Sequence, residues 1–158
     1  MMKTRLLLTG LMALALTACG GVEEVVEKEC PEIVVLATAD IWQEGDKAAQ
    51  MKTAQLVCFI DAKTDELLAD IVLTGTASQT GLELPFFVAT LDKNDAVVSR
   101  LQYKVKAGGT SFELKLPRYN YATRDTLVNK PRLVAGFVLS EAQLAANRAA
   151  YKKRIRLD

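Results

Sequence analysis

Cys19 is the residue whose surrounding sequence points most clearly to a chemical modification. It closes the segment Leu-Thr-Ala-Cys at 16–19, after an apolar run over residues 6–16 and a short basic start. A basic start, an apolar centre and small residues before a cleavage point are the parts of a secretory signal peptide. The apolar run is far shorter than the roughly 20 residues that a membrane-spanning helix needs. The pattern therefore predicts a signal peptide over residues 1–18 that is cleaved before Cys19.

The segment 16–19 also resembles the lipobox of bacterial lipoprotein precursors. That resemblance implies a diacylglycerol group on the Cys19 sulfur and a further acyl chain on the freed amine, and two or more acyl chains anchor a protein stably. Gly20 follows, where aspartate would favour retention at the inner membrane, so the expected location is the periplasmic face of the outer membrane. The alternatives are an uncleaved membrane helix and a secreted protein that merely begins with cysteine.

The chain contains no histidine, which removes the commonest general base and the commonest metal ligand. Ser-His-Asp and Cys-His nucleophile arrangements are therefore impossible, and the Ser-x-x-Lys pattern is also missing. We expect no enzymatic activity, no metal site and no cofactor apart from the acyl lipid on Cys19. A hydrolase that uses a carboxylate pair is the remaining catalytic alternative, although the sequence singles out no pair among its 19 acidic residues.

Two short segments look like ligand loops but are better explained as turns. Gly-Gly-Thr-Ser at 108–111 lacks the lysine and the glycine spacing of a phosphate loop. Asp-Lys-Asn-Asp at 92–95 starts like a calcium loop, but Val97 and Tyr103 stand where that loop needs glycine and glutamate. We interpret 108–111 as a hairpin turn and 92–95 as a solvated turn.

Cys30 and Cys58 remain as a pair if Cys19 is acylated, and an oxidising periplasm favours a disulfide between them. Closing a loop of this length would stabilise the fold by about 3–4 kcal/mol in the chain-entropy model. The alternative is that both are small buried hydrophobic residues with free thiols.

The charge is balanced overall but uneven along the chain. Removal of residues 1–18 takes away two of the 20 basic residues and leaves a net charge of −1, which gives no electrostatic footprint for nucleic acid. The length fits one domain. We divide the mature chain into a lipidated cysteine with an acidic tether over 19–29, in which a turn or two of helix could form, and a folded domain over 30–158 with a basic end.

The dominant hydrophobic period in the mature chain is two, which indicates strands. Seven segments read as strands: Ile33–Ala37, Gln55–Ile60, Leu67–Thr76, Leu84–Leu91, Val97–Val105, Phe112–Leu116 and Arg132–Leu139. Gln55–Ile60 is apolar on both faces, and Tyr119–Asn129 reads as a looser connection. In Val97–Val105 the odd-numbered residues should face the core, and this strand should form a hairpin with Phe112–Leu116 through Gly108-Gly109. The spacing predicts an antiparallel β-sandwich of the immunoglobulin-like kind, with about 7–8 strands.

One short helix is expected to close the chain. Ser140 and Gln143 fit a capping box, and Leu144, Tyr151 and Ile155 fall on one face at helical spacing. The basic tail that contains Lys152, Lys153 and Arg154 either complements the helix dipole or forms a patch for anionic head groups or an acidic partner. Trp42 either covers an edge of the core or makes an exposed contact with a ligand or partner.

Several segments resemble a family of small, uncharacterised proteobacterial outer-membrane lipoproteins. The resemblance covers most of residues 19–150 and is most distinctive between Gly136 and Arg148. It rests on Cys30-Pro31, Leu36-Ala37, Asp40, Cys58, the run from Leu84 to Ala89, the run from Gly136 to Ser140, Gln143-Leu144 and Asn147-Arg148. It implies an outer-membrane lipoprotein without an assigned activity. Asn147 and Arg148 are the polar positions of interest, although Arg148 could simply lay its stem across the sandwich and its head on a backbone carbonyl.

The functional expectation is a lipid-anchored, non-catalytic envelope protein that binds another protein as an accessory subunit. Its candidate contact residues are Trp42, Asn147, Arg148, Lys152, Lys153 and Arg154. The alternative is a binding module for envelope glycan or lipid, for which the basic tail is the positive indication.

Overall fold

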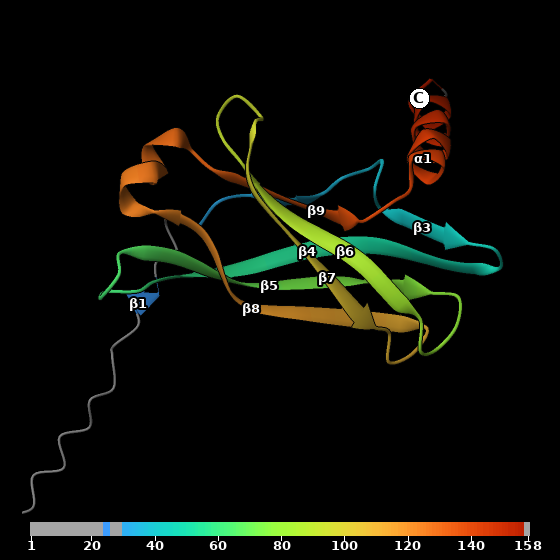
Figure 1. The fold of residues 1–158 in the computed structure, drawn as a ribbon, viewed down its shortest axis with the longest axis horizontal. Helices are drawn as coiled ribbons and strands as arrows, with labels where there is room; N and C mark the ends of the chain where they lie inside the picture. Colours follow the sequence, from blue (N-terminus) through green and yellow to red (C-terminus); the bar gives the residue numbers. More distant parts are fainter. Residues whose placement is uncertain (1–23, 26–29, 157–158) are drawn as a thin grey trace, which may run out of the picture.

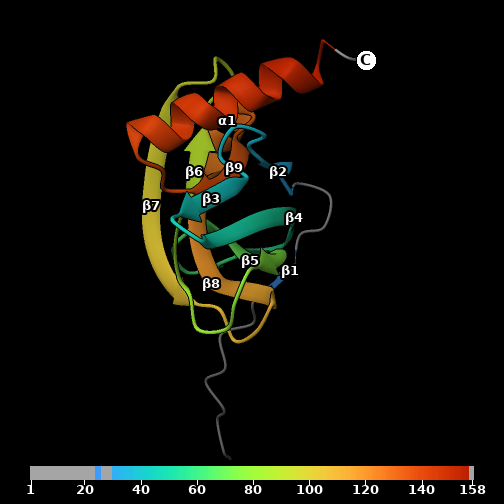
Figure 2. The ribbon, with the colours of Figure 1, turned by 90° about the vertical axis from the view of Figure 1, so that its right-hand side faces the viewer.

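The computed structural model describes residues 24–25 and 30–156, which form two β-sheets packed face to face with one α-helix at one end (Figure 1; Figure 2). The first sheet contains β1 (Glu24–Val25), β3 (Ile41–Glu44), β4 (Lys47–Ile60), β5 (Glu66–Ala77) and β8 (Ser111–Thr123). The second contains β2 (Ile33–Val35), β6 (Glu83–Leu91), β7 (Val97–Lys106) and β9 (Arg132–Phe137). A 3-10 helix, η2 (Arg124–Asn129), joins β8 to β9, and α1 (Glu141–Arg154) follows β9.

The strand order confirms the immunoglobulin-like sandwich. The first sheet has the order β1-β4-β5-β8, with β3 also paired to β4, and the second has the order β2-β9-β6-β7. In chain order and neighbours, β5, β6, β8 and β9 match strands B, C, E and F of an immunoglobulin domain. The expected all-antiparallel pairing is wrong at one place, because β2 runs parallel to β9. Here β2 takes the position beside F that strand G has in the immunoglobulin fold.

The expected hairpin between Val97–Val105 and Phe112–Leu116 is also wrong. β7 pairs with β6, whereas β8 pairs with β5 in the opposite sheet. The segment that contains Gly108 and Gly109 therefore crosses from one sheet to the other instead of turning a hairpin. As a consequence, β7 and β8 are the edge strands of their sheets on the same side of the sandwich.

Aspartate side chains fix two turns between neighbouring strands, one of which is the predicted turn at 92–95. Asp61 Oδ1 accepts the backbone N–H groups of Lys63 (2.8 Å) and Thr64 (3.4 Å) between β4 and β5. Asp92 Oδ1 accepts those of Asn94 (2.8 Å) and Ala96 (3.0 Å) between β6 and β7. Such side-chain bonds to nearby backbone are the usual reason for aspartate in turns.

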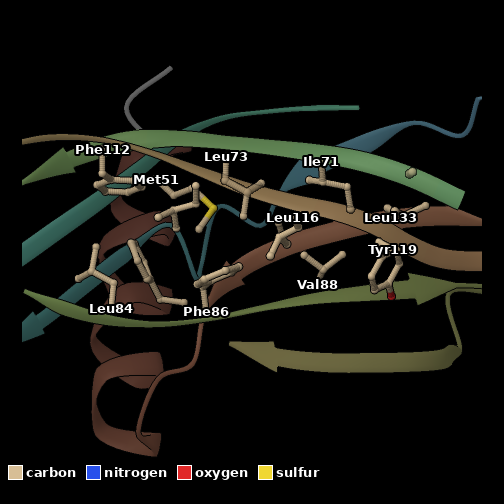
Figure 3. Packing of buried hydrophobic residues seen from close by; sticks show 14 of the residues in the cluster. Met51, Ile71, Leu73, Leu84, Phe86, Val88, Phe112, Leu116, Tyr119 and Leu133 are labelled. Carbon is tan, nitrogen blue, oxygen red and sulfur yellow. The ribbon is translucent and has the colours of Figure 1, made fainter. Parts of the chain in front are cut away.

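The hydrophobic core lies between the two sheets. Figure 3 shows Leu84, Phe86 and Val88 of β6 packed against residues of β4, β5 and β8. Phe112, Leu114 and Leu116 of β8 are buried, as the sequence predicts. Trp42 is 7% exposed and belongs to this cluster, so its interpretation as a residue at the edge of the core is confirmed.

A second, smaller apolar cluster covers the outer face of the second sheet. It contains Ala39, Phe87, Ala89 and Val134. Gly136 of β9 allows the segment before β3 to cross closely over the sheet, because a Cβ at this position would lie 2.7 Å from Ala39 Cβ and 3.2 Å from the Phe87 ring. This cluster supports the loop to which α1 is attached.

Three strand predictions need correction in their extent or burial. β4 starts eight residues earlier than Gln55, and it is buried on one face, since Val57 is 52% exposed. β8 continues through Tyr119 to Thr123, so the looser connection is confined to η2 and the residues after it. The sequence also did not predict β3, which forms a hairpin with β4 through a turn where Gly45 has a φ of +62°.

The N-terminal strand β1 is paired with the C-terminal end of β4. Glu24 and Val25 pair with Ile60 and Phe59 as a short strand, so these two residues are not helical. The predicted disulfide is present between Cys30 and Cys58. β4 has 14 residues and therefore spans about 45 Å between β1 at one end and the β3 hairpin at the other. Figure 1 places β1 and α1 at opposite corners of the sandwich, and Figure 2 shows α1 lying across the top with β1 well below it.

Candidate interaction surface

Helix α1 is attached to the sandwich mainly through polar contacts, because none of its described residues is buried. The predicted capping box is present: Ser140 Oγ accepts the Gln143 N–H, and Gln143 Oε1 accepts the Ser140 N–H. Gln143 also donates to the Gln43 carbonyl of β3. Asn147 donates from its amide to the carbonyls of Thr38 (3.2 Å) and Ile41 (2.8 Å). Asn147 therefore acts as an anchor for the helix, and its amide nitrogen is already engaged.

Replacing Asn147 by alanine should loosen α1 while the sheets stay intact. The change removes two hydrogen bonds to backbone carbonyls and should cost about 1–2 kcal/mol. Hydrogen exchange followed by mass spectrometry should show faster exchange in 141–154 and unchanged exchange in β5 and β6. Arg148→Ala is the matched control on the same helix, and equal exchange in the two variants would contradict this role of Asn147.

The predicted basic residues of α1 lie on its exposed surface. Arg154 donates from Nη2 to the Ala37 carbonyl (3.4 Å) and lies 5.7 Å from the centre of the Tyr151 ring. Arg148, Lys152 and Lys153 are exposed, and within the part of the chain that the structure describes their side chains make no ion pair or hydrogen bond. The carbonyl contact expected for Arg148 is thus made by Arg154. Ile155 is 55% exposed and does not complete an apolar helix face.

A cleft of about 690 Å³ opens beside the start of α1. Its walls come from the β3–β4 hairpin, the β5–β6 connection and the end of β7, and they include Glu44, Lys47, Glu83 and Lys104. These charges are of both signs and all are exposed. Trp42 also lines the cleft, but its ring is too deeply buried to serve as a platform for a sugar. The cleft is polar and open, without an aromatic stacking surface.

The most distinctive surface of the described chain is the free edge of β7. Val97, Val98 and Leu101 are 62%, 66% and 49% exposed, and they account for half of the large exposed hydrophobic residues in this part of the chain. The register between β6 and β7 shifts at Val98, where two residues of β7 occupy the place of one. The expectation that Val97 and Leu101 face a closed core is therefore wrong, because the facing sheet does not cover this edge.

A groove of about 300 Å³ continues from the start of β7 to the end of β8 and to η2. Its lining surface is mostly apolar and includes Leu91, Val98, Tyr121, Ala122 and Pro131. The walls belong to both edge strands, so the groove marks the place where the two sheets are open to each other. We call the free edge of β7 together with this groove the β7–β8 seam.

Hydrogen bonds between tyrosine, threonine and serine close the floor of the β7–β8 seam. Tyr119 Oη of β8 lies 3.2 Å from Thr90 Oγ1 and 3.3 Å from Ser99 Oγ, which joins β8 to β6 and β7. Further along β7, the Tyr103 ring stacks on Phe86 with 5.2 Å between the ring centres. Burial raises the pKa of the Tyr103 phenol, and the Tyr119 phenol adds to this effect. Hydroxyl groups from β6, β7 and β8 thus meet at the base of the seam.

Comparison of the chain with protein-family models, with curated proteins and with solved structures finds no match. The function has to be argued from this structure.

Across 24–25 and 30–156, no group of three histidine, cysteine or carboxylate side chains could hold a metal ion. Within the same residues, no helix has the length and apolarity to cross a bilayer. Cys19, Gly20 and the rest of the predicted signal and lipobox lie outside the described residues.

Sequence reasoning missed the β7–β8 seam because it paired β7 with the wrong strand. In the predicted hairpin, β8 would have paired with the edge of β7 that is free in the structure. The adjacent valines at 97 and 98 were the available signal, since two neighbouring apolar residues at the start of a strand interrupt an alternating pattern.

Proposed function

We propose that this protein is a lipid-anchored lipoprotein at the periplasmic face of the outer membrane that binds another envelope protein through the β7–β8 seam. The observation that carries the proposal is the cluster of exposed apolar residues on an unpaired strand edge, next to an apolar groove. In a protein that works alone, such an edge is normally covered, shortened or charged. The charged residues of β7 are Arg100, Lys104 and Lys106, which lie on the face away from the seam and leave its apolar side uncovered. Exposed apolar patches of this kind mark interaction sites.

The position of the predicted anchor supports this assignment. Cys19 precedes Glu24 by five residues, so it lies within about 17 Å of β1 whatever path the chain takes. An acyl anchor there would hold the sandwich by the β1 end, and α1 would be directed away from the bilayer. The β7–β8 seam would then lie on the flank of the domain, where a neighbouring protein can reach it.

Cross-linking in intact cells followed by capture of the full chain tests the proposal. A discrete protein partner should be recovered with the wild type and lost with Val98→Asp combined with Leu101→Asp, because two buried charges would face the apolar contact. Val57→Asp introduces the same group at an exposed valine on the opposite sheet and should retain the partner. A partner retained by the seam variant and lost by Lys152, Lys153 and Arg154 to alanine would move the interface to α1 and contradict the proposal.

Fractionation of the same cells tests whether the protein is anchored through Cys19. Cys19→Ala should shift the protein from the membrane fraction to the soluble periplasmic fraction. Recovery of glycan or lipid alone, without a protein, would favour the second candidate function, a glycan- or lipid-binding module. The polar cleft beside α1 is the structural feature that favours this candidate.

A further inference from the structure

The free edge of β7 is regular enough to accept another strand. After the shift at Val98, β7 pairs with β6 without interruption from Ser99 to Lys106. Other strand edges are less suitable: β8 contains Pro117 and register shifts, and β2 has three residues. Proline, bulges, short strands and charged side chains are the usual means of blocking an edge. In the described part of the chain, the outer edge of β7 has no partner strand and, beyond Val98, no proline, bulge or shortening, so only its charged side chains could oppose an added strand.

The side of β7 that faces the seam requires an apolar neighbour. Leu101 is on this side and is 49% exposed, and the groove beside Val98 is apolar. Successive residues of a strand point to opposite faces, so alternate side chains of an added strand would enter this region. Apolar side chains at those positions would cover Leu101 and fill the groove.

The other side of β7 requires an acidic neighbour. Its charged residues are Arg100, Lys104 and Lys106, and β7 contains no acidic residue. Lys106 is opposite Glu83 of β6, but Lys104 is opposite Pro85 and Arg100 is opposite Ala89. Arg100 does not guard the edge, because its guanidinium lies 4.5 Å from the centre of the Phe87 ring, over its own sheet. Arg100 and Lys104 are thus exposed and have no opposite charge across the strand pair.

From the two faces of β7 we infer that the partner supplies an extended segment, which adds to the sheet beside β7. This inference rests on the proposed function. The segment alternates apolar side chains, which enter the β7–β8 seam, with acidic side chains, which lie beside Arg100 and Lys104. Strand addition of this kind obtains affinity from backbone hydrogen bonds and specificity from alternate side chains. A second copy of this chain is disfavoured as the occupant, because joining two β7 strands would gather the positive charges of both on one face.

Peptide binding to the full mature chain, purified in detergent, tests this inference. Three fluorescent nine-residue peptides are compared: one alternates glutamate with valine, one lysine with valine, and one glutamate with serine. The glutamate–valine peptide should bind about tenfold more tightly than the other two, as expected from a few favourable cross-strand pairs. Arg100→Glu with Lys104→Glu should invert the preference between the glutamate and lysine peptides. Lys52→Glu with Lys63→Glu makes the same charge change elsewhere and should leave the preference unchanged.

Equal binding of all three peptides, or a preference that the reversal at Arg100 and Lys104 does not alter, would overturn the inference. A wild-type dimer that becomes monomeric with Leu101→Asp would also overturn it, in favour of a second copy. The proposed function and the inference about the added strand can be contradicted independently of each other. If cells yield a partner that needs Val98 and Leu101 but tolerates the charge reversal, the function stands and the acidic strand is wrong. If cells yield no partner while the peptides discriminate as expected, the function is wrong and the strand specificity stands.

Discussion

Gly75→Ala should destabilise the protein by about 3 kcal/mol, at the upper end of the usual cost of overpacking a core. Gly75 is in β5 and its missing side chain would point between the sheets. A Cβ there would overlap the backbone oxygen of Gln50 and the ring of Phe112, whose Cε1 would be 2.8 Å away. The ring is part of the buried core and the oxygen belongs to the neighbouring strand, so neither can move freely.

Thermal unfolding followed by circular dichroism measures this effect. The expected shift of the thermal midpoint is about 10 °C downward for a domain of this size. Gly108→Ala is the matched control, because nothing lies within 4 Å of the position of its Cβ. A loss below about 1 kcal/mol for Gly75→Ala would mean that β4 and β5 adjust to the methyl group, contrary to the close packing of protein interiors.

Removal of the disulfide should cost about 3–4 kcal/mol, since the bridge joins residues separated by 28 positions. The comparison is wild type against Cys30→Ala with Cys58→Ala, each with and without reductant. Cys58 is 2% exposed, so alanine leaves a small space and avoids a buried hydroxyl group. Reductant should lower the unfolding midpoint of the wild type nearly to that of the double variant and should not affect the variant itself. A wild type that resists reductant under partly unfolding conditions would contradict the expected contribution of the bridge.

Strand positions were predictable from the sequence where burial of one or both faces gives the strand an alternating or continuous apolar pattern. β5 and β6 are bounded within two residues of their predicted limits, because burial fixes their apolar pattern. β3 was missed because it has four residues and its signal is the turn at Gly45, not its own pattern. The register of β8 with β5 was not predictable, since the choice between a hairpin with β7 and a crossing to the other sheet depends on both sheets together.

The candidate site was predictable only in part, for the same reason. Asn147 and Arg154 were singled out as surface contacts, yet their side chains reach backbone carbonyls about 100 positions earlier in the chain. The β7–β8 seam depends on two strands being edges, which is a property of sheet order. The sequence of one strand, such as β7, does not show whether a second strand pairs with its other edge.

The pairing of β1 with β4 has a mechanical consequence for a tethered domain. While Glu24 and Val25 remain paired, the chain available between Cys19 and the sandwich is five residues long and reaches at most about 17 Å. If a pulling force detaches this two-residue pairing, the load passes to Cys30, which the disulfide holds to β4. The available chain then grows to 11 residues and a reach of about 38 Å, while β4 and the core remain in place. In a protein anchored at Cys19, as we propose, the short strand and the disulfide would together form a tether with two lengths, the longer of which ends at a covalent stop.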